Sequence, residues 1–301
     1  PSKWQSSIDT GVTKIPSANH FMVHANKLFV AHTNEEGVEY KNRIRWSLEN
    51  TPTNWDENHY IDLNGGGDGI TGMSVVSGQM VIFKPTAIYL LFGYDTDNFQ
   101  VVELTTTLGV LSHESIVSTE QGVYFYSHNN GLYFYNGSSL TYLFDNLKPA
   151  MELNYINPAA HEKLNVSWIG RRVWIAAPFS RTSTVTEPTV NFVFDPSIRN
   201  GVYTQFQTAD GFGVTAGTDW TDSNNNDYRL MCHPTEGWVL KVDLYDEEQD
   251  DIDGTPAPFL SYYKTRWFDG GTYLQKKMFR RPDFVIKESA LPQNITVKVY
   301  H

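Results

Sequence analysis

The 301-residue chain has a single cysteine, Cys232, so no disulfide can form within it. No apolar run approaches the roughly 20 residues that a membrane-spanning helix needs, and no stretch is typical of a signal peptide. The chain also lacks a long basic run, and its 23 lysines and arginines stand against 34 acids for a formal charge of −11. Nucleic-acid binding needs clustered lysines and arginines that displace counterions, so this composition argues against a DNA- or RNA-binding protein.

Motifs of catalysis and metal binding are also missing. The sequence holds no HExxH, no GxSxG and no GxxxxGK[ST] motif. Asn64–Gly69 is glycine-rich, but nothing helical follows it, so we interpret it as a turn between two sheets. Cys232 and His233 lack a second ligand pair, and the Asp/Asn-rich loops at 222–226 and 249–254 do not fit a calcium loop. We therefore predict no catalytic, cofactor-binding or metal-binding residue.

What the sequence does contain is 40% hydrophobic residues and 14% aromatic residues, which excludes a disordered chain. Helix signals are nearly absent, and short β runs bounded by Gly, Asn, Asp and Pro dominate. Their apolar residues often stand at successive positions, which is typical of sheets buried on both faces. The clearest predicted strands are Lys27–Ala31, Met80–Phe83, Ile88–Phe92, Val123–Tyr126, Leu132–Tyr135, Val173–Ala176, Asn191–Phe194 and Trp238–Val242.

The β runs repeat at intervals of roughly 40–60 residues, in units of about four short strands. The third strand of each unit is marked in turn by Ile44, Ile88, Leu132, Phe192 and Trp238. Such a repeat is what a β-propeller requires, because one blade cannot cover both of its own faces. We predict an all-β propeller over 20–260 with five recognisable blades and room for six or more. A β-sandwich with long loops is the alternative.

The two ends of the chain lie outside these repeats. We expect 1–19 to complete a blade or to enter from outside, and 261–301 to form a further β segment, as part of a truncated sandwich or a final blade. The chain begins at Pro1 without an initiator methionine and stops directly after a strand-like run. An unpaired terminal strand invites aggregation, so we expect a fragment of a longer protein.

The negative charge is concentrated in one loop, whose acids are Asp243, Asp246, Glu247, Glu248, Asp250, Asp251 and Asp253. Without these seven the formal charge of −11 falls to −4. Seven like charges cannot share an interface without partners, so we expect this loop to face water or a lumen. A basic cluster, a docking patch for an acidic partner or a solvated face, follows at Lys276, Lys277, Arg280 and Arg281.

Three aromatic residues, Trp55, Trp220 and Tyr228, stand in polar segments that we expect to be exposed loops. Exposed aromatics stack on sugars or fill interfaces between subunits, and we favour the interface.

Asn42–Asn64, NRIRWSLENTPTNWDENHYIDLN, resembles the R-x-R-[WY]-S … P-x-x-W segment of the tail-hub, nozzle and DNA-stabilisation proteins of tailed bacteriophages. Later segments of the chain are similar to strand blocks of that family in the same order: Ile82–Phe83, Ile88–Gly93, Leu108–Gly137 and Thr265–Val285. The likeness covers most of the chain through loose motifs. No portal-docking tail is visible in the sequence.

The resemblance implies a structural protein of the virion tail, assembled in the host cytoplasm. Such proteins form propeller-bearing homo-oligomeric rings that contact other tail and portal-adaptor proteins and, at the host, the cell envelope. DNA passes through the ring without specific binding, and an acidic wall would repel its phosphates. We expect no enzymatic activity and no cofactor. The alternative is a propeller that binds or hydrolyses carbohydrate at the host surface.

Overall fold

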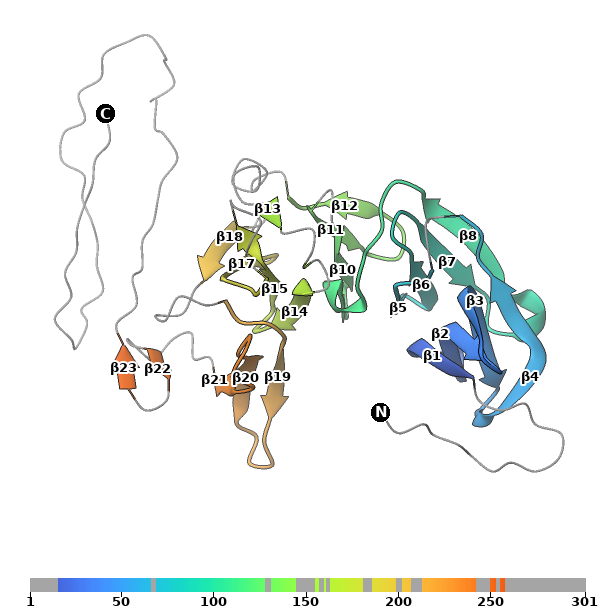
Figure 1. The fold of residues 1–301 in the computed structure, drawn as a ribbon, viewed down its shortest axis with the longest axis horizontal. Helices are drawn as coiled ribbons and strands as arrows, with labels where there is room; N and C mark the ends of the chain where they lie inside the picture. The colour runs from blue at the N-terminus through green and yellow to red at the C-terminus, as the bar shows by residue number, and fades with distance from the viewer. Residues whose placement is uncertain are drawn as a thin grey trace, which may run out of the picture. The chain divides into compact units, whose positions relative to one another are not determined.

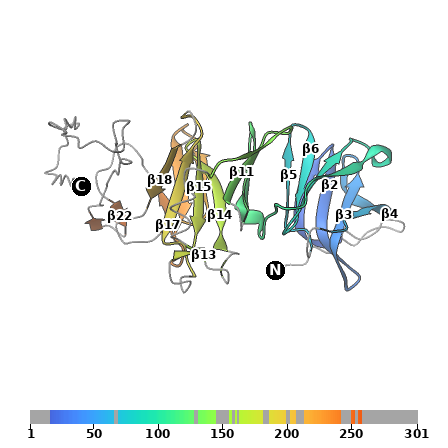
Figure 2. The same ribbon diagram turned by 90° about the horizontal axis from the view of Figure 1, so that it is seen from above.

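The computed structural model is all-β, and the chain divides into two compact units, Pro1–Asp243 and Leu244–His301. It describes residues 16–65, 69–127, 131–144, 155–156, 160, 163–180, 186–198, 202–206, 213–241, 250–252 and 255–257. The first unit holds a series of small antiparallel sheets, which Figures 1 and 2 show in two views. The second holds one described hairpin, β22 (Asp250–Ile252) with β23 (Thr255–Ala257).

Five sheets follow one another along the first unit, and strands in each sheet pair with their neighbours in chain order. Sheet 1 consists of β1 (Ser17–His24), β2 (Lys27–Glu35), β3 (Val38–Leu48) and β4 (Thr51–Asp62). Sheet 2 consists of β5 (Gly72–Val76), β6 (Gln79–Phe83), β7 (Ile88–Phe92) and β8 (Gln100–Thr105). Sheet 3 consists of β9 (Ile116–Thr119), β10 (Gly122–Ser127), β11 (Gly131–Tyr135) and β12 (Leu140–Tyr142).

Sheets 4 and 5 continue the series. Sheet 4 consists of β14 (Asn165–Ile169), β15 (Arg172–Ala177), β17 (Val190–Asp195) and β18 (Val202–Phe206). Sheet 5 consists of β19 (Gly217–Thr221), β20 (Asp227–Cys232) and β21 (Val239–Lys241). A two-stranded pair, β13 (Tyr155–Ile156) with β16 (Phe179–Ser180), and two 3-10 turns, η1 (Thr96–Asn98) and η2 (His113–Ser115), complete the described elements.

The predicted all-β class and the repeating units are confirmed. Each of the eight predicted strands overlaps an observed one. Four of the third-strand markers, Ile44, Ile88, Leu132 and Phe192, lie in the third strand of sheets 1 to 4, and Trp238 directly precedes β21. The described residues of the glycine-rich segment, Asn64, Gly65 and Gly69, lie between sheets 1 and 2, and the rest of this predicted turn lies outside the described residues.

Consecutive sheets pack face to face, which explains the successive apolar residues. In β10, Val123 and Phe125 join a core with sheet 2, while Tyr124 and Tyr126 join a core with sheet 4. Side chains of a strand alternate between its two faces, so a strand covered on both sides is apolar throughout. Sheet 1 packs on sheet 2 in the same way through Phe29, Ala31, Ile44 and Trp46.

The first strands of the sheets lie next to one another in order: β1 contacts β5, β5 contacts β9, β9 contacts β14, and β14 contacts β19. Gly72 in β5 shows how closely two of them approach, because a Cβ there would lie 2.5 Å from Ile116 Cδ1 in sheet 3. The remaining strands of each sheet therefore extend away from a shared seam of first strands.

Candidate functional site

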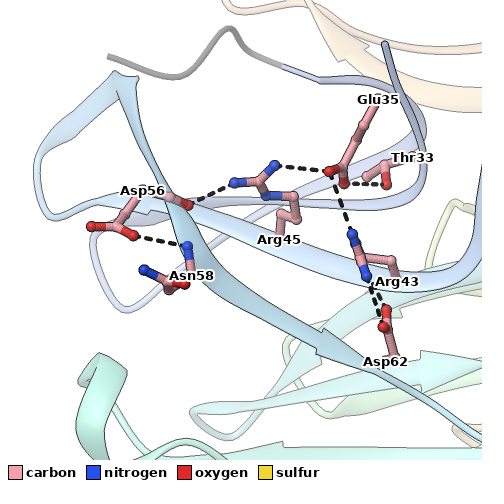
Figure 3. Close-up of polar contacts among 7 residues, drawn as sticks. All are labelled: Thr33, Glu35, Arg43, Arg45, Asp56, Asn58 and Asp62. Atoms are coloured by element: carbon pink, nitrogen blue, oxygen red, sulfur yellow. Dashed lines mark hydrogen bonds and ion pairs between the residues drawn. The ribbon is translucent and has the colours of Figure 1, made fainter. Parts of the chain in front are cut away.

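The segment that carries the family resemblance forms, together with Thr33 and Glu35, a partly buried polar network on sheet 1 (Figure 3). The Glu35 carboxylate accepts hydrogen bonds from Arg45 Nη1 at 3.1 Å and from the Thr33 hydroxyl at 2.9 Å, and Arg43 Nη1 lies 3.4 Å away. Arg45 Nη2 donates to the Asp56 carbonyl oxygen at 2.6 Å. Arg45 is only 5% exposed, so water solvates little of its charge. The hydrogen bonds to these partners must offset that loss of solvation.

Arg43 extends the network to the fourth strand. Its Nε and Nη2 donate to the two carboxylate oxygens of Asp62, both at 2.8 Å, in a bidentate pair. Its guanidinium also lies between two aromatic rings, 3.8 Å from the Tyr40 centroid and 4.0 Å from that of Tyr60. The hydrogen bonds to Asp62 raise the pKa of Arg43 above its ordinary value. These contacts tie β2, β3 and β4 together.

The other residues of the resembling motif have structural roles too. Ser47 is fully buried, and its hydroxyl accepts from Leu28 N at 3.0 Å and donates to the Leu48 carbonyl oxygen at 2.9 Å. Trp55 Nε1 donates to the Pro52 carbonyl oxygen at 2.9 Å. The expectation that Trp55 is an exposed loop residue was wrong: it lies in β4 and is 3% exposed. It pairs with Ser47 of β3, so this ring contributes to the core.

A second polar cluster lies where sheets 1, 2 and 3 meet. His20 in β1 and His113 in η2 have ring centroids 5.6 Å apart. His20 Nε2 lies 3.2 Å from the Ile70 carbonyl oxygen, and His32 and Glu114 also act on its charge. Burial, and then the neighbouring His113, lower the pKa of His20 from 6.5 to about 4. A neutral His20 is therefore part of the joint between these sheets.

This joint predicts acid sensitivity. The pKa of His20 is about 4 in the folded chain against an ordinary value of 6.5. The unfolded chain consequently binds more protons between these values, and stability is full above about pH 6.5 and falls as the pH drops towards about 4. His20→Gln keeps a donor for the Ile70 carbonyl and removes this titration. We expect a flatter melting-temperature profile across that window, measured by thermal unfolding. A profile as steep as the wild type would contradict the assignment.

Sheet 5 carries the two remaining predicted aromatics. Trp220 in β19 and Tyr228 in β20 are a cross-strand pair whose rings stack at 5.5 Å, and Lys241 Nζ lies 5.6 Å from the Tyr228 ring. Trp220 is exposed, as predicted, but both residues lie in strands rather than in loops. The Asp/Asn-rich loop at 222–226 connects these two strands as a hairpin.

Hydrogen bonds to the Asp222 side chain fix the conformation of this hairpin connection. The Asp222 carboxylate accepts from Asn224 N at 2.8 Å, Asn226 N at 2.9 Å and the Tyr228 hydroxyl at 3.3 Å. The bond from Asn226 N is the main cause that lowers the pKa of Asp222. These carboxylate oxygens are engaged in a local turn, which agrees with the sequence interpretation of this segment as a solvated loop.

Sheet 5 is joined to sheet 4 by polar contacts on its other face. The fully buried Asn191 of β17 donates to the Val214 carbonyl oxygen and accepts from Val214 N, both at 2.7 Å. The Asp219 carboxylate accepts from Gly170 N at 3.0 Å. Gly217 N donates to the Ser167 hydroxyl at 3.2 Å. The face of sheet 5 that carries Gly217 thus contacts sheet 4, although Asp219 on the same face is exposed.

A fully buried lysine marks the turn between sheets 1 and 2. Lys84 Nζ donates to the carbonyl oxygen of Leu63 at 3.3 Å and to that of Gly65, so it anchors the glycine-rich segment. The sequence motifs gave no signal for Lys84, nor for Glu35, Asp62, His20 or His113. Each acquires its role through partners that the fold brings together, and only the Arg-x-Arg spacing was a visible signal.

Most residues of the predicted acidic loop and basic cluster lie outside the described residues. The basic cluster of Lys276, Lys277, Arg280 and Arg281 lies outside the described residues, as do Asp243, Asp246, Glu247, Glu248 and Asp253. Asp250 and Asp251 lie in β22, where the strand alone is described. Cys232, at the end of β20, is half-buried in a strand.

The described residues lack two further features. No group of three or more His, Cys, Asp or Glu side chains in these segments is placed to hold a metal ion. The part of the chain that the structure describes contains no helix with the length and apolarity that crossing a bilayer demands.

No protein-family model and no curated protein matches the sequence. Among solved structures, the chain is similar to a Bacteroides uniformis protein assigned provisionally as a 6-phosphogluconolactonase. The two share 11% identity over 73% of this chain and 68% of that one, with a TM-score of 0.43. It is also similar to the N-terminal domain of Nup159, with 11% identity over 81% and 65% of the two chains and a TM-score of 0.43. At these scores the similarities carry no argument about the function of this chain.

Proposed function

We propose that the five sheets are blades of a β-propeller, and that the chain is a structural subunit of a bacteriophage tail. It would act as a hub or nozzle component that forms part of the DNA-ejection conduit and a platform for other tail proteins. The propeller is supported by the order of the sheets and by their neighbouring first strands, since blades radiate from their first strands. The described residues supply four four-stranded blades and one three-stranded blade.

One observation carries the tail assignment: the residues of the resembling motif have defined structural roles in sheet 1. Arg43 and Arg45 bind the acids of neighbouring strands, Ser47 bridges β2 and β3, and the buried Trp55 donates to the Pro52 carbonyl oxygen within β4. Residues that hold strands together indicate a shared architecture better than exposed residues do. Because the resembling motif has such structural roles, the resemblance supports a structural protein that works by assembly with other proteins.

The test is the place of the full-length protein in virions. Mass spectrometry of purified particles should detect the chain at several copies per particle. Light scattering of the isolated protein should give a mass of several subunits. A strictly monomeric protein that is missing from particles would overturn the proposal.

A second candidate function is carbohydrate binding, and the exposed Trp220 stacked on Tyr228 is the observation that favours it. Sugar rings stack on such aromatic faces, and Lys241 adjoins the pair. Titration with bacterial glycans, followed by tryptophan fluorescence, tests this function. Saturable binding that is lost in Trp220→Ala but kept in Trp238→Ala would establish it.

A further inference from the structure

Strand β1 carries two histidines on the side that packs on sheet 2. His20, Met22 and His24 alternate along β1, so their side chains lie on one face. Met22 packs against the core that sheets 1 and 2 share. His20 Nε2 lies 3.2 Å from the carbonyl oxygen of Ile70, just before β5. His24 hydrogen-bonds the backbone of Gly93, directly after β7. The two rings therefore join β1 to sheet 2 at separate places.

His24 lies in a setting that disfavours a positive charge. It is 8% exposed, and its Nε2 has no hydrogen-bond partner among the described residues. Its register partner Lys27 is 3% exposed, and Lys27 Nζ donates to the Tyr94 carbonyl oxygen at 3.3 Å. Protonation of His24 would create a buried donor without an acceptor beside a second buried cation. Burial, and to a lesser degree Lys27, accordingly lower the pKa of His24.

The charged groups around the two histidines do not offset these effects. His113 and His32 both disfavour a charge on His20, while Glu114 favours it with a smaller effect. Lys27 Nζ is 4.0 Å from the Glu49 carboxylate, which is 59% exposed and so screened by water. The charged residues on the neighbouring strands and turns are likewise exposed: Glu39, Lys41, Glu49, Asp95 and Asp97.

The histidines of the described residues are concentrated in sheet 1. Of the six described, four lie in this sheet: His20, His24, His32 and His59. His113 contacts His20 from η2, and His233 lies in sheet 5. The described cores between sheets 2 and 3 and between sheets 3 and 4 contain no histidine. Mild acid therefore acts on the joint of sheet 1 and spares the next two joints.

We propose that sheet 1 separates from sheet 2 in mild acid while sheets 2 to 4 stay packed, and that protonation of His20 and His24 drives this opening. Both rings are neutral in the closed joint. In the open joint both reach water and bind protons with a pKa near the ordinary 6.5. The open form thus binds more protons, so it gains population as the pH falls below about 6.5. This inference does not rest on the proposed place in a virion.

The size of the effect follows from proton binding. The pKa of His20, about 4 in the closed joint against 6.5, raises the opening constant by up to about 20-fold between pH 7 and pH 5. His24 acts in the same direction. With two such groups, the opening constant should depend on more than the first power of the proton concentration between pH 6 and pH 5. With one group it cannot exceed the first power.

The test is native-state amide hydrogen exchange of the full-length protein at pH 7, 6 and 5, read by mass spectrometry and corrected for intrinsic exchange rates. Sheet 1 loses its core when it separates, so amides of β1 and β2 should lose protection by more than 10-fold between pH 7 and pH 5. Amides of β10 and β11 should keep theirs. Glu39 and Glu114 have pKa values below the ordinary 4.5 and stay charged in this window.

Glutamine variants assign the opening to the two histidines. His20→Gln and His24→Gln keep a neutral donor for the same backbone partner and cannot gain a proton. Each should lower the dependence on proton concentration to the first power or less, and the double variant should show almost no pH dependence in β1. The matched control is His233→Gln, which removes a histidine from sheet 5 and should keep the wild-type response.

Three results would overturn the proposal. Protection in β10 that falls in parallel with β1 would show that acid unfolds the unit as a whole. Constant protection of sheet 1 from pH 7 to pH 5 would show that the joint does not open. A wild-type response in both single variants would assign the opening to other groups. Circular dichroism at pH 7 checks that each variant folds, and the first two results need the wild type alone.

Discussion

Replacing Arg45 by methionine is expected to lower the free energy of unfolding by about 3 kcal/mol. The methionine fills much of the volume of the arginine, so the loss comes from the polar contacts. Glu35 would lose its 3.1 Å partner and the Asp56 carbonyl oxygen its 2.6 Å donor, both at a residue that is almost fully buried. Glu35 keeps Thr33 and Arg43, which holds the effect at the lower end of the range for a broken buried pair.

The measurement is guanidinium unfolding followed by tryptophan fluorescence. Arg172→Met is the matched control, because Arg172 also pairs with a carboxylate, Asp195, across neighbouring strands, at 3.0 Å. Its side chain is 31% exposed, so the control should lose at most about 1 kcal/mol. Equal losses in the two variants would mean that the network adds nothing beyond a surface ion pair. A double variant with Glu35→Gln then measures the coupling between Arg45 and Glu35.

The strands could be predicted from the sequence because their signal is local. β6 and β10 are runs of successive apolar residues bounded by turn residues, and sheets covered on both faces impose that pattern. The third-strand markers were predictable for a related reason. Sheets 2 and 3 each bury most of their third strand, so Ile88 and Leu132 mark equivalent places in the two sheets.

The arginine network could not be predicted from spacing, because it depends on an irregular register. β2 and β3 shift in register between Ala31 and Thr33, and the intervening His32 has a positive φ of 54°. This bulge precedes Glu35, whose carboxylate contacts Arg43 and Arg45. A one-residue shift reverses the face on which later side chains lie. The sequence shows the arginines but not the bulge that pairs them with an acid.

Contacts between sheets were beyond sequence reasoning for another reason. His20 lies in sheet 1 and His113 in the turn η2 before sheet 3, and the two meet only because the first strands of the sheets lie together. Trp55 was misplaced because its neighbours are polar, whereas its burial depends on pairing with Ser47 and on the Pro52 carbonyl oxygen. Polar neighbours in the sequence indicate that a side chain is exposed only where its own face of the strand is in contact with water.

The joint between sheets 4 and 5 gives the second large prediction. Asn191→Ala is expected to lower the free energy of unfolding by about 3 kcal/mol, because it removes two buried hydrogen bonds of 2.7 Å at once. The N–H and carbonyl of Val214 would lose both of these bonds in a buried setting, since Val214 is 1% exposed. A leucine at position 191 would fill the space but not restore the bonds, so Asn191→Leu should recover little stability.

Asn191→Ala should change amide hydrogen exchange most strongly near sheet 5, in addition to lowering the free energy of unfolding of the whole unit. Val214 lies three residues before the start of β19 at Gly217, so its loss of anchoring should raise amide hydrogen exchange in β19 and β20 before it affects sheets 1 to 3. Asn58→Ala is the matched control, because Asn58 is an exposed asparagine on β4. It should leave both stability and exchange near wild type. If Asn191→Ala instead raised exchange evenly over all five sheets, Asn191 would stabilise the unit as a whole rather than fasten sheet 5 to it.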